Sequence, residues 1–288
     1  MRYEGILYRP PSEAYSLIVQ ATIGCSHNRC SFCSMYKGKS FRIRSADEVI
    51  SDIEHMKRSM PARRIFIADG DALALKTDEL YKILDYIVKD VPQCERVGIY
   101  GSPASILSKS DDELRQLCDM GLGIVYTGLE SGCDDVLKDV NKGYSAAEII
   151  EACLRVKRAG IKTSITAILG LAGKRGWQQH AAKTGRALSA IKPDYIGLLT
   201  LMLEPGTELY KRYQNGEFEY PSPEDITRET LVMLQNMDCE GSVFRSNHAS
   251  NYLPLKATLN AGRAGLIKTL ESALLSGACY RPERYRGL

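Results

Sequence analysis

The sequence predicts an α/β fold, a partial (β/α)6 TIM-like barrel followed by a short C-terminal helical extension. Apolar runs of strand length alternate about six times with amphipathic helical stretches, which is typical of a parallel sheet or barrel. The apolar runs contain few charges, as expected for strands that are covered on both faces. The 288 residues also suffice, because six strand–helix units need roughly 200 residues.

The expected strands are rich in Ile, Val, Leu and Tyr. In chain order they are Leu17–Thr22, Arg64–Ala68, Val97–Tyr100, Gly123–Thr127, Thr163–Leu169 and Tyr195–Leu201. Three of the intervening helices should begin at a Ser-x-x-Glu capping box, in which each side chain satisfies a backbone N–H of the first turn. These boxes are Ser45 with Glu48, Ser110 with Glu113, and Ser145 with Glu148, and Gly160 should end the last of these helices.

We expect three segments along the chain. Residues 1–16 form an N-terminal lead-in, residues 17–215 form the barrel, and residues 216–288 form a C-terminal cap or extension. In this extension, Ser222-Pro223 favours a helix that runs from Glu224 to about Met237. A polar turn over residues 245–252 and a last helix near Leu255–Leu275 should follow.

The composition is that of a globular protein. Hydrophobic residues make up 44% and charged residues 25%, which excludes a disordered chain. The formal net charge of +3 is too small to indicate nucleic-acid binding. Because no apolar run is long enough to span a membrane and the first residues do not resemble a signal peptide, we expect a cytoplasmic protein. Its nine cysteines should then be thiols or metal ligands and not disulfides.

The most specific motif is Cys25-x4-Cys30-x2-Cys33, which directly follows the first expected strand. Thiolates this close together suit an iron–sulfur cluster or zinc. Structural zinc needs four ligands, and His27 could be the fourth. A [4Fe–4S] cluster held by three cysteines would instead leave one iron open to bind another molecule. Chance grouping of buried thiols is the third alternative; the other six cysteines show no comparable spacing.

Glycine and carboxylate residues gather where the expected strands end. The segments are Asp69-Gly70-Asp71, Tyr100-Gly101-Ser102-Pro103, Thr127–Gly132, Gly170–Gly173 and Leu203–Thr207. Glycine allows a ligand to approach the backbone closely, and carboxylates can bind ammonium or hydroxyl groups. Since the carboxyl ends of barrel strands carry the active site, these segments indicate a single binding site.

From about Leu17 to Tyr210, these motifs resemble the radical S-adenosylmethionine (SAM) superfamily, in particular the subgroup with oxygen-independent coproporphyrinogen oxidases and methylthiotransferases. Members usually show C-x3-C-x2-C, so this chain has one additional residue, while Phe32 before the last cysteine matches the family pattern. The resemblance implies a [4Fe–4S] cluster bound by Cys25, Cys30 and Cys33, with SAM bound to it.

The resemblance also assigns roles around SAM. Asp69, Gly70 and Asp71 stand where the family contacts the methionine amino group, and Ser102 follows at the next strand end. Glu130 would face the ribose or methionine part, and Lys142, where arginine is common, the carboxylate. The segment Ile168–Leu171, including Gly170, resembles the motif beside adenine, and Leu203 would lie near the same ring.

The implied chemistry is reductive cleavage of SAM to methionine and a 5′-deoxyadenosyl radical, which takes hydrogen from a small or medium organic substrate. Flavodoxin or ferredoxin would supply the electron, and the enzyme would be oxygen-sensitive. No catalytic residue, substrate or oligomeric state is indicated. Four residues of the polar segment, Arg245, Asn247, His248 and Asn251, could contact substrate, although a capped turn before the last helix is the commoner explanation of such a segment.

Two alternatives of other classes remain open. One is a cluster- and SAM-binding heme carrier or chaperone without turnover, and the other is a zinc-stabilised barrel. The 16 residues before the barrel leave no room for a cobalamin domain, and we expect neither a second cluster nor the additional domains of methylthiotransferases. Cys239 or Cys279 could donate hydrogen to a product radical.

Overall fold

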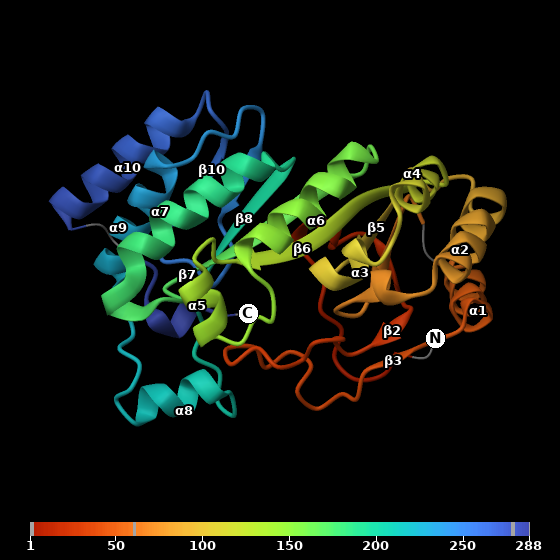
Figure 1. Ribbon diagram of the computed structural model, residues 1–288, viewed down its shortest axis with the longest axis horizontal. Coiled ribbons are helices and arrows are strands. Elements are labelled where there is room, and N and C mark those ends of the chain that lie inside the picture. Colours follow the sequence, from red (N-terminus) through yellow and green to blue (C-terminus); the bar gives the residue numbers. More distant parts are fainter. Residues whose placement is uncertain (1–2, 60–61, 278–279, 288) are drawn as a thin grey trace. The chain divides into compact units, whose positions relative to one another are not determined.

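The computed structural model describes residues 3–59, 62–277 and 280–287, and Figure 1 labels its elements. The described chain divides into two compact units. Unit 1 contains the residues up to Asn28, Met35–Thr127 and Glu151–Thr163. Unit 2 contains Arg29–Ser34, Gly128–Ile150 and the residues from Ser164 onward.

Unit 1 is built on parallel strands. These are β1 (Leu17–Gln20), β4 (Arg64–Ala68), β5 (Arg96–Tyr100) and the first part of β6 (Leu122–Glu130), and each pairs with the next in parallel. A short antiparallel ribbon joins β2 (Thr22–Ile23) to β3 (Arg42–Ile43). The helical elements are η1 (Pro11–Glu13), α1 (Ala46–Met56), η2 (Ala72–Ala74), α2 (Thr77–Asp90), α3 (Pro103–Leu107) and α4 (Asp111–Asp119).

The core of unit 1 forms where the apolar faces of amphipathic helices pack against apolar strands. Val49 and Ile53 of α1 and Ile83 of α2 are fully buried in one cluster with Ile65 and Ile67 of β4. Burying such side chains contributes about 1.5–3 kcal/mol each. The capping boxes predicted at residues 45–48 and 110–113 are both present, so α1 and α4 begin where expected.

Unit 2 contains the end of β6, most of β7 (Lys162–Leu169), β8 (Tyr195–Thr200), β9 (Val243–Ser246) and β10 (Leu255–Thr258). Strand β8 pairs in parallel with both β7 and β9, whereas β10 is antiparallel to β9. The helical elements are α5 (Asp134–Asp139), the start of α6 (Ala146–Arg158), α7 (Gly173–Ile191), α8 (Glu208–Gln214), α9 (Pro223–Gln235), α10 (Arg263–Ser276) and η3 (Glu283–Tyr285). From Glu151 onward, α6 belongs to unit 1. Helix α9 packs against α7 and α10.

The predicted α/β class with mostly parallel strands is confirmed, and all six expected strands agree to within about three residues. The first strand is shorter than predicted. It ends at Gln20, because the chain turns after Ala21 and Thr22 pairs antiparallel with Ile43. The capping box of Ser145 with Glu148 and the turn at Gly160, which has a φ of +86°, are also present.

The prediction for the C-terminal segment was partly wrong. Helix α9 is present, with Ser222 as its N-cap. However, Leu255–Thr258 forms strand β10 and not the start of the last helix, which begins only at Arg263. Residues 245 and 246 of the expected turn belong to β9. The reason is tertiary, since Leu255–Thr258 gains ladder hydrogen bonds from Val243–Ser246 that helical periodicity does not reveal.

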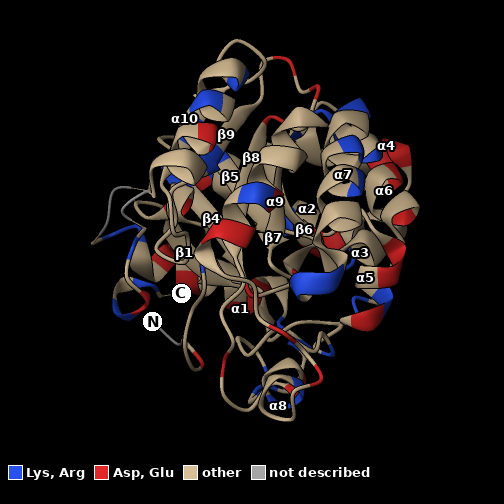
Figure 2. Cartoon of the chain, turned by 90° about the vertical axis from the view of Figure 1, so that its left-hand side faces the viewer, with Lys and Arg blue, Asp and Glu red and all other residues tan. Residues whose placement is uncertain are grey.

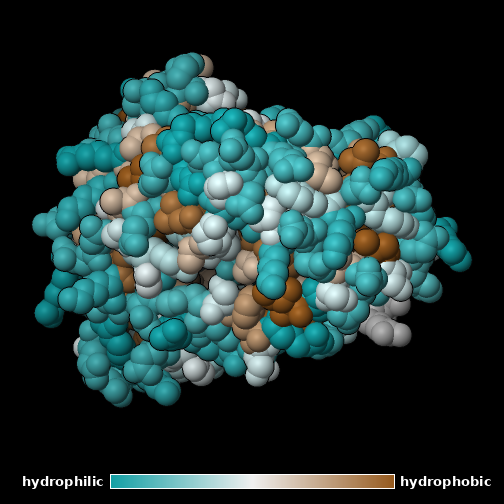
Figure 3. All heavy atoms as spheres, turned by 45° about the vertical axis from the view of Figure 1, so that its right-hand side comes forward, coloured by the Kyte–Doolittle hydropathy of each residue, from teal (hydrophilic) through white to brown (hydrophobic). Residues whose placement is uncertain are grey.

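Both signs of charge are interspersed along the helices (Figure 2), in keeping with the small net charge. The face shown in Figure 3 is mainly hydrophilic, with apolar groups that are separate and small. A search of the described helices finds none with the length and apolar character needed to cross a membrane.

Candidate cofactor site

In unit 1, the first cysteine of the motif lies against the end of β4. Gly70 follows this strand and donates its N–H to the Gly24 carbonyl at 3.1 Å. A Cβ atom at Gly70 would lie 3.1 Å from Cβ of Cys25 and 2.7 Å from a ring carbon of Tyr36. The site of Cys25 therefore depends on the missing side chain at Gly70, a close approach that only glycine permits.

Replacing Gly70 with alanine is expected to displace the Cys25 loop, because neither neighbour is the flexible end of a side chain. The overpacking should cost about 1–3 kcal/mol and lower iron incorporation several-fold. Iron content after anaerobic reconstitution and thermal unfolding would measure both effects. Gly38→Ala is the matched control, since a Cβ there would meet nothing within 4 Å. Equal iron content in the two variants would contradict the expectation.

Asp69 is fully buried and anchors the chain that leads into the cysteine motif. Its Oδ2 atom accepts hydrogen bonds from the Gly24 N–H at 3.1 Å, from Nε2 of Gln20 at 3.0 Å and from Nζ of Lys39 at 3.0 Å. Its Oδ1 atom is buried and has no hydrogen-bond partner among the described residues. A buried carboxylate oxygen without a donor is costly, so this atom fits an N–H donor of a ligand, such as the amino group of SAM.

Asp71 and Ser102 have partners within the protein. Oδ1 of Asp71 accepts from the Ser102 N–H at 2.9 Å and from the Ser105 hydroxyl at 2.6 Å, and Oδ2 accepts from the Ser26 hydroxyl. Ser102 also caps α3. Asp71 thus ties the end of β4 to the residue after Cys25 and to α3. Its contact with a cofactor stays a prediction.

In unit 2, the segment that carries the other two cysteines is held by backbone hydrogen bonds. The Ser31 N–H donates to the Val140 carbonyl at 2.9 Å, and the Ser31 carbonyl accepts from the Leu209 N–H at 2.8 Å. The Cys33 N–H donates to the Cys30 carbonyl at 3.4 Å. Both thiols are half-buried, as is Cys25, so each is shielded but accessible.

None of the eight described cysteines is in a disulfide, and Cys279 lies outside the described residues. Within the described ranges, no group of three or more His, Cys, Asp or Glu side chains is arranged for a metal ion. The fit to a cluster therefore rests on the chemistry of the donor set, three accessible thiols in nine residues, and on the unsatisfied oxygen of Asp69.

Glu130 and Lys142 form an ion pair of 2.9 Å in unit 2, and each side chain is only 12% exposed. Glu130 has a φ of +59°, and its carboxylate folds back over Gly128, where a Cβ atom would overlap it. A non-glycine residue in this conformation is uncommon. The resemblance assigned these side chains to different parts of SAM and did not predict that they pair. A spacing of 12 residues matches no local pairing pattern, so this ion pair has no signal in the sequence.

Unit 2 also brings together the apolar residues expected near the cofactor. Phe32, Leu171 and Leu203 belong to one cluster with Leu201 and Phe218. Next to them, Gly170 has a φ of +80°, and a Cβ atom there would lie 2.9 Å from Cδ1 of Ile226. The strand exits after β7 and β8 therefore share an apolar wall, whose contact with adenine stays a prediction.

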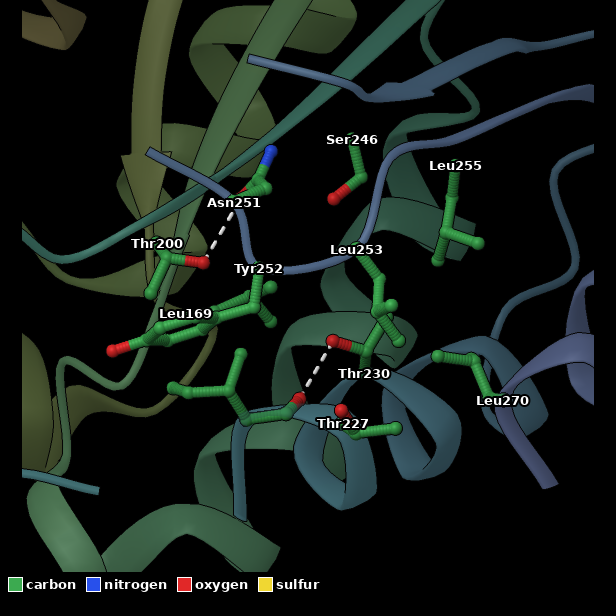
Figure 4. Close-up of a pocket in the computed structure, with 11 residues that line it drawn as sticks. Leu169, Thr200, Thr227, Thr230, Ser246, Asn251, Tyr252, Leu253, Leu255 and Leu270 are labelled. Atoms are coloured by element: carbon green, nitrogen blue, oxygen red, sulfur yellow. Dashed lines mark hydrogen bonds between the residues drawn. The ribbon is translucent and has the colours of Figure 1, made fainter. Parts of the chain in front are cut away.

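The four predicted substrate residues do not form one group. Arg245 and Asn247 are exposed. Asn251 is buried, where Oδ1 accepts from Oγ1 of Thr200 at 2.9 Å and Nδ2 donates to the Leu198 carbonyl at 2.8 Å. It lines a cavity of about 10 Å³ (Figure 4), the space of a single water. Asn251 therefore attaches its loop to β8, and substrate contact by the four residues stays a prediction.

His248 is half-buried and accepts the Ser250 N–H at Nδ1, at 3.1 Å. Burial, together with the charge of Arg281, lowers the pKa of His248 below its usual 6.5. The folded protein thus binds fewer protons here than the unfolded chain. Stability from this group is present above pH 6.5 and is lost as the pH falls from there towards the folded-state pKa.

The prediction is that His248→Gln reduces the loss of thermal stability between pH 7.5 and 5.5. His55→Gln, which changes an exposed histidine of α1, is the control and should leave that loss unchanged. Melting temperatures of the three proteins at both pH values test this. Parallel pH profiles for wild type and His248→Gln would contradict it.

The sequence reasoning missed several polar residues that shape the site. Lys39 neutralises Asp69, while His180 and Glu229 lie behind the end of β7. Arg281 and Arg286, from the C-terminal tail, bind the backbone of residues 248–252. Each acts over a sequence separation that no local motif spans. The sequence signal that could have indicated such contacts was the presence of arginines, which have long side chains, in the turn-rich C-terminal tail.

The fold is that of a partial TIM barrel in the α/β class. The family model of the Radical SAM superfamily matches residues 19–178, and the chain therefore belongs to this superfamily. Its members are mostly enzymes, and membership implies a [4Fe–4S] cluster and SAM as cofactors. The fold and superfamily predicted from the sequence are thereby confirmed.

Several relatives are similar at low identity. The heme chaperone HemW of Bacillus subtilis is 22% identical over 75% of this chain and 58% of its own length. A putative methylthiotransferase of Methanocaldococcus jannaschii is 27% identical over 52% of the chain and 34% of its own length. The chain thus spans only about a third to three fifths of these two curated relatives.

Solved structures support the fold. Coproporphyrinogen III oxidase (HemN) from Escherichia coli superposes with a TM-score of 0.56 at 18% identity, over 76% of this chain and 52% of that one. The methyltransferase TsrM from Kitasatospora setae, solved with cobalamin and a [4Fe–4S] cluster, gives a TM-score of 0.56 at 19% identity over 72% of this chain and 42% of its own.

Proposed function

We propose that the chain is a radical SAM enzyme in which Cys25, Cys30 and Cys33 hold one [4Fe–4S] cluster. When bound, the cluster and SAM supply reductive cleavage to methionine and a 5′-deoxyadenosyl radical that abstracts hydrogen from a small or medium organic substrate. The observation that carries the proposal is the cysteine motif within a chain of this superfamily. Three thiolate ligands leave one iron for SAM.

The chain's own residues would bind and orient SAM. The unsatisfied Oδ1 of Asp69 suits the amino group. Lys142 would attract the carboxylate, and Glu130 would accept hydrogen bonds from hydroxyls, provided their ion pair opens or is shared with the ligand. Phe32, Leu171 and Leu203 would supply the apolar wall beside adenine. This wall would also exclude water from a reactive radical.

The electron would come from a small redox protein such as flavodoxin or ferredoxin, and the cluster would make the protein oxygen-sensitive. The substrate would be a small or medium organic molecule, and the superfamily scaffold hosts many chemistries.

A heme carrier or chaperone without turnover is the second candidate. It is favoured by the matches to heme chaperones from Bacillus subtilis and Lactococcus lactis, at 22% identity each. Such a protein would keep the cluster and the SAM site and would also bind heme. Adding heme would then change its visible spectrum, whereas the enzyme of the first proposal would show no saturable change.

The test is anaerobic reconstitution with iron and sulfide, followed by dithionite and SAM, with 5′-deoxyadenosine as the product measured. Wild type should form it even without substrate, and the Cys25→Ala/Cys30→Ala/Cys33→Ala variant should not. Cys94→Ala/Cys118→Ala, which changes two half-buried thiols outside the motif, is the control and should retain activity. A four-iron protein that binds SAM and heme but forms no deoxyadenosine would favour the carrier.

A further inference from the structure

A fully buried His–Glu pair lies behind the end of β7 in unit 2. His180 of α7 and Glu229 of α9 are both 0% exposed, with 3.2 Å between Nε2 and Oε1. Nε2 of His180 is also 3.1 Å from the Ile168 carbonyl. Because both neighbours of Nε2 are acceptors, this nitrogen carries a proton. Burying two ionisable groups is costly even when they form a pair, so the pair needs an explanation.

The pair contacts two backbone segments that are distant in sequence. Nδ1 of His180 is 2.8 Å from the Ser131 hydroxyl, and Ser131 directly follows Glu130. Oε1 of Glu229 accepts the Gly170 N–H at 2.9 Å. The buried His–Glu pair thus contacts both the turn formed by Glu130, Ser131 and Gly132, here called the Glu130 turn, and the segment after β7. These are the two segments of unit 2 assigned above to SAM.

The same side of α7 holds the Glu130 turn a second time. Thr184, one helical turn after His180, accepts the Gly132 N–H at Oγ1, at 2.8 Å. A Cβ atom at Gly132 would overlap the Lys183 carbonyl, so the turn packs directly on the helix backbone. The position of this turn therefore depends on the position of α7. Helix α7 is in turn linked to α9 through the His–Glu pair.

Glu229 is not satisfied by this arrangement alone. Its Oε2 atom is buried and has no hydrogen-bond partner among the described residues. Replacing buried polar pairs by apolar side chains is often neutral or stabilising. A contribution to folding stability therefore explains the buried carboxylate of Glu229 poorly. Its hydrogen bonds explain it better, because they hold the Gly170 N–H and His180 in one fixed geometry.

We propose that His180 and Glu229 are positioning residues that hold the Glu130 turn and the Gly170 backbone in the geometry that binds SAM. The inference rests on the proposed function, since it concerns the same SAM site. It adds two residues that do not touch SAM themselves and act through Ser131 and Gly170.

The test is SAM affinity of the reconstituted, cluster-containing protein, measured by equilibrium dialysis. Glu229→Met removes the acceptor at similar volume and should weaken SAM binding about tenfold or more, the effect of losing one charge-assisted hydrogen bond. Glu229→Gln keeps an acceptor for Gly170 and should stay within about threefold of wild type. Ser131→Ala, a milder change that keeps Glu229, should weaken binding several-fold.

Glu224→Met is the matched control, because Glu224 is exposed on the same helix. Iron content should be equal in all variants. If Glu229→Met and Ser131→Ala lower the melting temperature but leave the SAM affinity unchanged, the positioning role is overturned. The proposed function would then remain intact. If Glu229→Met does not fold, unchanged affinity in Ser131→Ala alone overturns it. A four-iron wild type that binds no SAM overturns both proposals.

Discussion

Replacing any one of Cys25, Cys30 or Cys33 by alanine is expected to reduce iron from about four atoms per chain to about one or fewer after reconstitution. The reason is that each cysteine binds a different iron, and with only three protein ligands none of them is redundant. The thiols are half-buried, so solvent thiols cannot replace them freely. Iron and sulfide analysis of the purified variants, with the absorbance near 400 nm, measures the effect.

Cys94→Ala and Cys118→Ala are the controls, since both are half-buried thiols with no neighbour at chelating spacing. Each should incorporate iron as wild type does. A motif variant with full iron content would contradict the assignment of that cysteine. One atom of zinc and no iron in wild type, with His27→Ala losing the zinc, would instead support the zinc-stabilised barrel.

Arg286→Ala is expected to destabilise the protein by about 3 kcal/mol. The Arg286 side chain is fully buried and donates to the Leu201 carbonyl at 3.0 Å and to the Ser250 carbonyl at 2.7 Å. It also donates to the Tyr252 and Tyr220 hydroxyls at 2.6 and 3.1 Å. Removing it leaves these acceptors with fewer donors and opens a cavity beneath the tail.

The measurement is urea unfolding followed by fluorescence. Arg284→Ala is the matched control, because Arg284 is an exposed arginine two residues away whose described contact is with the exposed ring of Tyr285. Arg286→Lys should recover only part of the loss, since one ammonium cannot reproduce a planar fork of donors. Equal free energies of unfolding for Arg286→Ala and Arg284→Ala would contradict a stabilising role of Arg286.

The sequence predicted the parts of the fold that are determined locally. Strands such as Arg64–Ala68, which is buried from Ile65 onward, combine β-propensity with burial, and the capping boxes at Ser45 and Ser110 mark helix starts within a few residues. The last strand was missed because Leu255–Thr258 is a strand only through its pairing with Val243–Ser246.

The site was predictable where chemistry is encoded in spacing. Three cysteines within nine residues identify a ligand set, and glycines at strand ends identify close approaches, as at Gly70. The polar residues that fix these elements were not predictable. His180 reaches Ser131 from 49 residues away, and Arg286 reaches Leu201 from 85 residues away, so their roles exist only in the folded chain.

The central claim is that the three-cysteine motif holds a cluster with one iron open to SAM. It is tested most directly by electron paramagnetic resonance of the dithionite-reduced protein, with SAM carrying ¹⁵N in its amino group. The account predicts a [4Fe–4S]⁺ signal that changes on adding SAM and shows hyperfine coupling to the labelled nitrogen. A four-iron signal that is unchanged by saturating SAM, or the absence of any cluster signal, would contradict it.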